Sequence, residues 1–180
     1  MKQIKMFGLG GQGVVTAAKV FCEAVAIHEN AYAQAIPAYG HERRGAPVYA
    51  DAMISRDPIK MKGFVYAPDD VVIFDVSVME KGIDVMAGTT DQTVFIINAP
   101  VLEEDYPFNG HKVYWVDAQA IAIETLGVDI PNTAMLGALA GAGLVGIEAV
   151  KSAIANKFGT NARPNLTAAQ AACDNIASNG

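Results

Sequence analysis

The sequence has 180 residues, of which 52% are hydrophobic and 18% charged, and its formal net charge is −6. This length and composition predict one domain over residues 1–180 with a sizeable core, and they exclude a disordered chain and a general binder of nucleic acid. No signal-peptide core precedes the first glycines and no apolar run is long enough for a membrane span, so a cytoplasmic location is expected.

Apolar strand patterns alternate with helical patterns along the first two thirds of the chain. Strands are predicted over residues 4–7, 31–36, 47–54, 70–74, 93–97 and 113–116. Helices are predicted over residues 14–28, 76–86 and 118–126. This alternation predicts an α/β fold with a Rossmann-like, doubly wound, mostly parallel sheet.

The C-terminal third is predicted to be helical. Asn132 is the expected N-cap of a helix that ends near Gly141, and a second helix over residues 147–158 ends at Gly159. A last helix is expected over residues 167–176.

Glycines follow the first predicted strand and precede the first predicted helix. Gly8, Gly10 and Gly13 form the pattern G-x-G-x-x-G, which permits a tight turn and places a helix N-terminus next to a diphosphate. An NAD or FAD site of this kind needs an acid at the end of the second strand, where this chain has Ile36 and Pro37. Another diphosphate ligand, a partner's backbone and a purely structural turn therefore all remain open.

A compact basic segment follows the second predicted strand, between Gly40 and Gly45. It contains His41, Glu42, Arg43 and Arg44, with Tyr39 just before it. The guanidinium fork of arginine suits phosphate or carboxylate, and the position after a strand predicts that the segment lies beside the glycine loop. The alternative is a surface salt-bridge cluster or a subunit contact.

Other candidate residues give weaker indications. Asp75, Asn98 and Asp117 follow predicted strands, where polar side chains can point at a ligand but are more often helix caps. The two cysteines, Cys22 and Cys173, are too few for a four-cysteine cluster, and Cys22 is expected in the core. No nucleophile, paired histidines, metal set or thiamine-binding motif is recognisable, so the prediction is no catalytic residue, no metal site, and a part of an enzyme.

Four segments together resemble the gamma subunit of 2-oxoacid:ferredoxin oxidoreductases. They are residues 8–18, 32–37, 42–48 and 132–138, in which Glu-Arg-Arg-Gly-Ala-Pro at residues 42–47 is similar to the branch acting on pyruvate, 2-oxoisovalerate and aryl 2-oxoacids such as phenylglyoxylate. The resemblance implies an enzyme that converts a 2-oxoacid, coenzyme A and an oxidised acceptor to acyl-CoA, carbon dioxide and a reduced acceptor. Pyruvate is the commonest substrate of that branch.

The resemblance also implies what the partners supply. Thiamine diphosphate, magnesium and 4Fe–4S clusters are expected on companion alpha, beta and delta subunits of a hetero-oligomer, with ferredoxin or an NAD-reducing subunit as acceptor. The gamma subunit is expected to pack against the thiamine-bearing subunits and to be linked to coenzyme A.

Coenzyme A would explain the missing acid, because its ribose carries a phosphate that an acid would repel. The predicted cofactor-binding residues are Gly8, Gly10, Gly11, Gln12, Gly13, Arg43 and Arg44. Residues 10–13 would hold the pyrophosphate, and an arginine would steer a phosphate or brace the neighbouring subunit. The alternatives are a stand-alone Rossmann-type oxidoreductase that binds NAD or FAD, and an assembly subunit with an unoccupied glycine loop.

Overall fold

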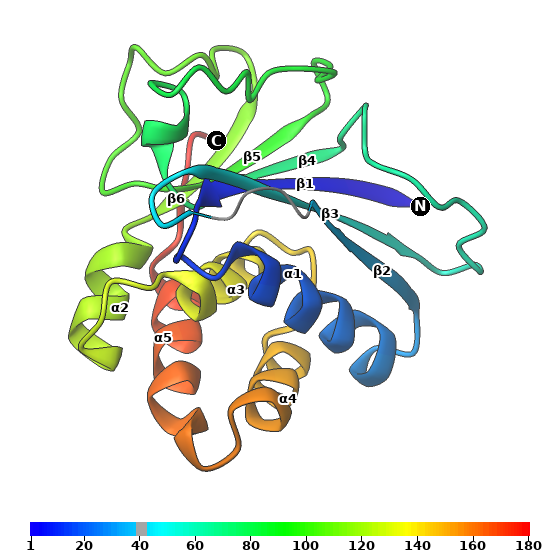
Figure 1. The fold of residues 1–180 in the computed structure, drawn as a ribbon, viewed down its shortest axis with the longest axis vertical. Coiled ribbons are helices and arrows are strands. Elements are labelled where there is room, and N and C mark those ends of the chain that lie inside the picture. The colour runs from blue at the N-terminus through cyan, green and yellow to red at the C-terminus, as the bar shows by residue number, and fades with distance from the viewer. Residues whose placement is uncertain (39–42) are drawn as a thin grey trace.

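A computed structural model describes residues 1–38 and 43–180 and contains one seven-stranded mixed sheet (Figure 1). The strands are β1 (Lys2–Leu9), β2 (Tyr32–Pro37), β3 (Pro47–Ser55), β4 (Asp70–Ile73), β5 (Val94–Asn98), β6 (Lys112–Val116) and β7 (Ala177–Ser178), in the order β2-β3-β1-β4-β5-β6-β7. The central strands β1, β4, β5 and β6 are parallel, whereas β3 is antiparallel to both β1 and β2, and β7 is antiparallel to β6. The predicted α/β class with a parallel centre is confirmed.

Helices cover one face of the sheet (Figure 1). They are α1 (Val14–Glu23), which continues as a π-helical turn over Ala24–His28, then α2 (Ala118–Leu126), α3 (Asn132–Gly141), α4 (Ile147–Phe158) and α5 (Ala162–Asn175). Phe21, Met135 and Leu139 are fully buried in the core between this layer and the sheet. The predicted helical C-terminal third is confirmed, and α4 has the predicted bounds.

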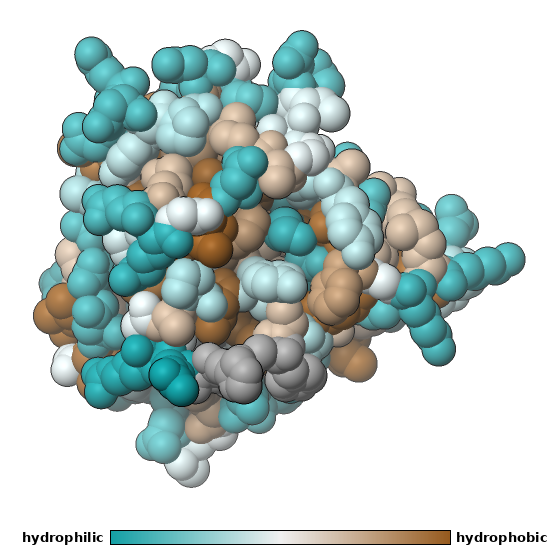
Figure 2. Space-filling model, turned by 45° about the horizontal axis from the view of Figure 1, so that its top comes forward, coloured by the Kyte–Doolittle hydropathy of each residue, from teal (hydrophilic) through white to brown (hydrophobic). Residues whose placement is uncertain are grey.

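The opposite face is covered by irregular crossovers, residues 76–92 and 99–111, which connect β4 to β5 and β5 to β6. Val78, Val85 and Phe108 of these crossovers bury a second apolar cluster against the sheet. The chain thus crosses both faces, although helices cover only one. Figure 2 shows this side of the molecule, with apolar residues toward its middle and mostly hydrophilic ones along its outline.

The prediction of a helix over residues 76–86 is wrong, because only the 3₁₀ turn Val76–Val78 forms there. Gly82 and Gly88 have φ values of 79° and 75°, which end any regular helix within this crossover. The apolar residues in it contact the sheet from successive turns instead of from one helical face.

Two expectations for the C-terminal region need smaller corrections. Pro131, not Asn132, occupies the N-cap of α3, and Asn132 is the first helical residue. Helix α5 begins at Ala162, because Pro164 lies in the first turn, where its missing N–H has no helical acceptor anyway. The two-residue strand β7 was not predicted.

None of the helices in residues 1–38 and 43–180 is long and apolar enough to cross a membrane.

Candidate functional site

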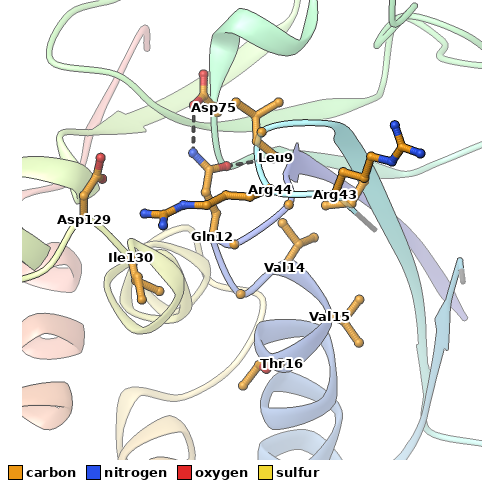
Figure 3. Close-up of a pocket in the computed structure, with 15 residues that line it drawn as sticks. Leu9, Gln12, Val14, Val15, Thr16, Arg43, Arg44, Asp75, Asp129 and Ile130 are labelled. Atoms are coloured by element: carbon orange, nitrogen blue, oxygen red, sulfur yellow. Dashed lines mark hydrogen bonds between the residues drawn. The ribbon is translucent and has the colours of Figure 1, made fainter. Parts of the chain in front are cut away.

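A cavity of about 810 Å³ lies at the carboxyl end of β1 (Figure 3). Its walls are the glycine loop, the first turn of α1, the residues just before β3, and the connection between α2 and α3. Ligands of open α/β sheets bind at this end of the strands. The lining residues are Leu9, Gly10, Gly11, Gln12, Gly13, Val14, Val15, Thr16, Arg43, Arg44, Gly45, Val48, Asp75, Asp129 and Ile130.

Three of the predicted glycines are required by contacts within the protein. A Cβ atom on Gly8 would lie 2.6 Å from Val14 Cγ2, and one on Gly10 would collide with the backbone carbonyl oxygen of Arg43. Gly13 has φ 76°, and a Cβ there would lie 2.5 Å from Asn132 Nδ2. These glycines therefore permit close packing of the loop, whether or not a ligand is bound.

Gly11 differs from the other three. Its φ is 98°, and the only atom within 4 Å of an added Cβ would be Arg44 Cγ, at 3.6 Å. The residue is exposed and lines the cavity. Gly11 is thus the glycine at which a ligand can approach the backbone closely.

The basic segment lies against the glycine loop, as the sequence predicted for its described part. Gly10 N–H donates to the Ala46 carbonyl at 2.8 Å, and Gly45 N–H donates to the Gly10 carbonyl at 3.0 Å. Of the predicted segment, Tyr39, Gly40, His41 and Glu42 lie outside the described residues.

The two arginines point in different directions (Figure 3). The Arg44 side chain extends over the glycine loop on the side of Gln12 and Asp129, whereas the Arg43 side chain points away from them. No carboxylate in the described part of the chain forms a salt bridge with either arginine. Arg44 is therefore the arginine placed to meet an anion in the cavity.

The N-terminus of α1 opens into the same cavity. Gly13 is its N-cap in the left-handed conformation and supplies no side-chain cap, and the first helical hydrogen bond runs from Ala17 N–H to the Gly13 carbonyl at 2.9 Å. The amides of Val14, Val15 and Thr16 precede that bond, so the helix itself offers them no acceptor. With the positive end of the helix dipole and Arg44, they favour an anionic ligand.

Polar residues after the strands act mainly as caps, as expected. Asp117 Oδ1 accepts from Ala120 N–H at 2.8 Å at the start of α2, and Asn98 Oδ1 accepts from Gln119 N–H at 3.2 Å. Asp75 caps the turn after β4 and also lines the cavity.

The cavity also contains two residues that the sequence did not predict, Asp129 and Ile130. Asp129 Oδ2 accepts from Gln119 Nε2 at 2.9 Å. They lie far from the glycine loop in sequence, and only the packing of α2 and α3 beside α1 brings them there, so no local pattern could have found them.

The described part of the chain shows no metal cluster, and the Cys22 thiol is not reactive. Residues 1–38 and 43–180 contain no group of three or more His, Cys, Asp or Glu side chains that could hold a metal ion. Cys22 is buried, as predicted, and burial raises the pKa of its thiol to about 12, so it is not a nucleophile at neutral pH.

Comparisons with known proteins assign the chain to a family. The family described as pyruvate ferredoxin/flavodoxin oxidoreductase matches residues 3–175, and the chain belongs to it. The predicted gamma-subunit type is confirmed by the relatives. The common gamma subunit of the pyruvate/ketoisovalerate oxidoreductases of Pyrococcus abyssi is 46% identical over 88% of this chain and 87% of its own.

A second relative and a solved structure agree with this assignment. The pyruvate synthase subunit PorC of Methanosarcina barkeri is 42% identical over 86% of this chain and 85% of its own length. The crystal structure of the pyruvate oxidoreductase subunit PORC of Thermotoga maritima covers all of both chains with a TM-score of 0.84 and 28% identity. The sheet with its helical layer and the helical C-terminal region is therefore the fold of this subunit type.

Proposed function

We propose that this chain binds coenzyme A through the cavity at the glycine loop, as one subunit of a complex that oxidatively decarboxylates a 2-oxoacid. The observation that carries the proposal is the meeting of three anion-attracting features in one cavity: the uncapped N-terminus of α1, the open backbone at Gly11, and the side chain of Arg44. Coenzyme A offers both a pyrophosphate and a ribose phosphate to such a site.

The proposal assigns the remaining chemistry to companion subunits. Thiamine diphosphate, magnesium and 4Fe–4S clusters would sit on alpha, beta and delta subunits, and this chain, a single domain over residues 1–180, would contribute assembly and coenzyme A binding without a catalytic residue. Pyruvate is the proposed substrate, with 2-oxoisovalerate and phenylglyoxylate as the alternatives. The proposed electron acceptor is ferredoxin or an NAD-reducing subunit. The complex would be cytoplasmic.

The stand-alone NAD- or FAD-binding oxidoreductase is not favoured. The named relatives are subunits of larger oxidoreductases, and β2 ends at Pro37 without an acidic residue.

The test is the replacement Gly11→Leu in the assembled complex. A side chain at Gly11 enters the cavity, so we expect the apparent KM for coenzyme A to rise by about tenfold or more. Gly82→Leu is the matched control, because Gly82 also has a positive φ (79°) and open space around it but does not line the cavity. An unchanged KM for coenzyme A in an assembled Gly11→Leu complex would contradict the proposal.

A further inference from the structure

Both the oxygen and the nitrogen of the Gln12 side-chain amide form hydrogen bonds within the protein (Figure 3). Its Oε1 accepts a hydrogen bond from Leu9 N–H at 2.8 Å, and its Nε2 donates to Asp75 Oδ2 at 2.7 Å. Asp75 Oδ1 in turn accepts from Ser77 N–H at 2.9 Å. One amide therefore connects the end of β1, the glycine loop and the crossover that follows β4.

Only an amide of this length satisfies both neighbours. The Leu9 N–H needs an acceptor and the Asp75 carboxylate needs a donor, so neither a carboxylate nor an alkyl group can replace Gln12. Gly8 supplies the space, because a Cβ there would lie 3.1 Å from Gln12 Oε1. The first glycine of the pattern thus accommodates the glutamine amide as well as the start of α1.

The same contacts orient a carboxylate that lines the cavity. Asp75 lines the cavity together with Arg44, and a carboxylate turned into the cavity would repel a phosphate. Gln12 and Ser77 each donate to one of its oxygens, which holds the carboxylate toward the protein. An interaction with a charged acceptor is also stronger than one between neutral groups.

We propose that Gln12 and Asp75 form a positioning pair for the anion-binding loop. This inference rests on the proposed coenzyme A site. It assigns Gln12 to positioning the backbone of the glycine loop, whereas the sequence predicted that Gln12 contacts the ligand. The pair fixes the backbone of residues 9–13, so that the amides at Gly11 and at the start of α1 face the cavity. Neither side chain needs to touch the ligand.

The first variant is Gln12→Glu, which places a second carboxylate at hydrogen-bonding distance from Asp75. Two such carboxylates share a proton, because one of them has a strongly raised pKa. At about pH 8 the pair repels, and we expect the apparent KM for coenzyme A of the assembled complex to rise about tenfold with little change in kcat at saturation. Lowering the pH toward about 6 protonates one carboxylate and restores a donor, so the variant-to-wild-type ratio of KM should fall.

The second variant exchanges the two groups, as Gln12→Glu/Asp75→Asn. The introduced carboxylate accepts from Leu9 N–H, and the introduced amide donates to that carboxylate while it accepts from Ser77 N–H. All three hydrogen bonds are then kept, and only the one between residues 12 and 75 has its donor and acceptor reversed. We expect the KM for coenzyme A to return to within about threefold of wild type at about pH 8, with no pH-dependent recovery.

Gln12→Met gives a neutral variant that fills similar space and removes both hydrogen bonds. It should raise the KM at every pH and remains informative if the charged variants do not assemble. Equal KM values for the single and the exchanged variant, or an unchanged KM in Gln12→Met, would overturn the positioning pair. Failure of the coenzyme A site itself is distinguished by Gly11→Leu, which would then leave the KM unchanged as well.

Discussion

Arg43 and Arg44 are adjacent in the sequence but differ in what they can reach. The backbone of Arg43 contacts the glycine loop through its carbonyl group, and its side chain points away from Gln12 and Asp129, whereas the Arg44 side chain crosses the loop. The sequence alone could not choose between them, since both belong to the same basic segment. The division of roles follows from the direction of each side chain.

We predict that Arg44→Gln weakens coenzyme A binding and that Arg43→Gln has little effect. A charge-assisted hydrogen bond to phosphate is worth about 1.5–3 kcal/mol, so the apparent KM for coenzyme A should rise about tenfold to a hundredfold in Arg44→Gln. Steady-state kinetics of the two assembled variants at several salt concentrations measure this. Equal effects of the two substitutions would assign the arginines to assembly and not to the ligand.

Only those parts of the candidate site that are formed by continuous segments of the sequence could be predicted. The glycine pattern and the basic segment identified two walls of the cavity, and the expected closeness of the two segments is confirmed for residues 43–46. The pattern could not show that Gly8, Gly10 and Gly13 are needed for internal packing, because that depends on Phe74, Arg43 and Asn132 from other elements. The same limit applies to the partners of Gln12.

Among the elements, α3 and α5 show why a buried helix contains so many small residues. Gly137 in the middle of α3 faces the backbone of Ala169 in α5, and a Cβ there would collide with the Ala169 carbonyl oxygen. At Gly141, one turn later, an added Cβ would lie 2.6 Å from Ile176 Cγ2 and 3.0 Å from the Cys173 carbonyl oxygen. Both glycines thus permit close approach of α5, and the neighbouring backbone lies closer at Gly137 than at Gly141.

We predict that Gly137→Ala destabilises the fold and Gly141→Ala does so less. Alanine normally gains about 1 kcal/mol over glycine within a helix, but at Gly137 the two helices must separate, an overpacking cost of about 1–3 kcal/mol or more. Thermal unfolding of the purified chain should show the lower Tm for Gly137→Ala. A Tm for Gly137→Ala equal to or above that of Gly141→Ala would show that α5 moves freely away from α3.

Strands and helices with a regular apolar pattern could be predicted from the sequence, whereas the irregular crossover that covers the other face of the sheet could not. The buried strands β4 and β5 have continuous apolar runs, and the helix α4 has a period and a terminal glycine. The crossover over residues 76–92 has apolar residues too, yet Gly82 and Gly88 need positive φ there, and its shape is set by the sheet beneath. Strand β7 is only two residues long and forms because α5 ends next to β6.

At the scale of the whole molecule, β1 is the strand around which both faces are organised. Ile4 and Met6 point into the helical layer and Phe7 into the crossover layer. Its lysines also pair with buried carboxylates on both neighbouring strands: Lys5 Nζ lies 3.4 Å from Asp51 Oδ1 on β3, and Lys2 Nζ lies 3.1 Å from Asp70 Oδ2 on β4. The sheet centre therefore contains ionisable groups whose charge state is linked to folding.

Asp51 is one of these two buried carboxylates, and we predict that its ionisation destabilises the protein. Its side chain is fully buried and accepts from Val65 N–H at 2.7 Å, which fastens the segment between β3 and β4 to the sheet. Burial raises the pKa of Asp51 above its ordinary value, an effect that the hydrogen bond from Val65 and the charge of Lys5 only partly offset. Between the unfolded-state pKa and this higher folded-state pKa, the folded protein binds more protons, so stability falls as the pH rises.

Asp51→Asn imitates the protonated carboxyl and removes this pH dependence. The free energy of unfolding of the variant relative to wild type should therefore increase as the pH is raised from about 4 through the folded-state pKa. Urea unfolding of both proteins across that range measures the difference, with Asp57→Asn, an exposed residue of the same segment, as the control. A relative stability that falls over this range would mean that the pair with Lys5 outweighs the burial of the charge, and the centre of the sheet would then depend on the ion pair and not merely tolerate it.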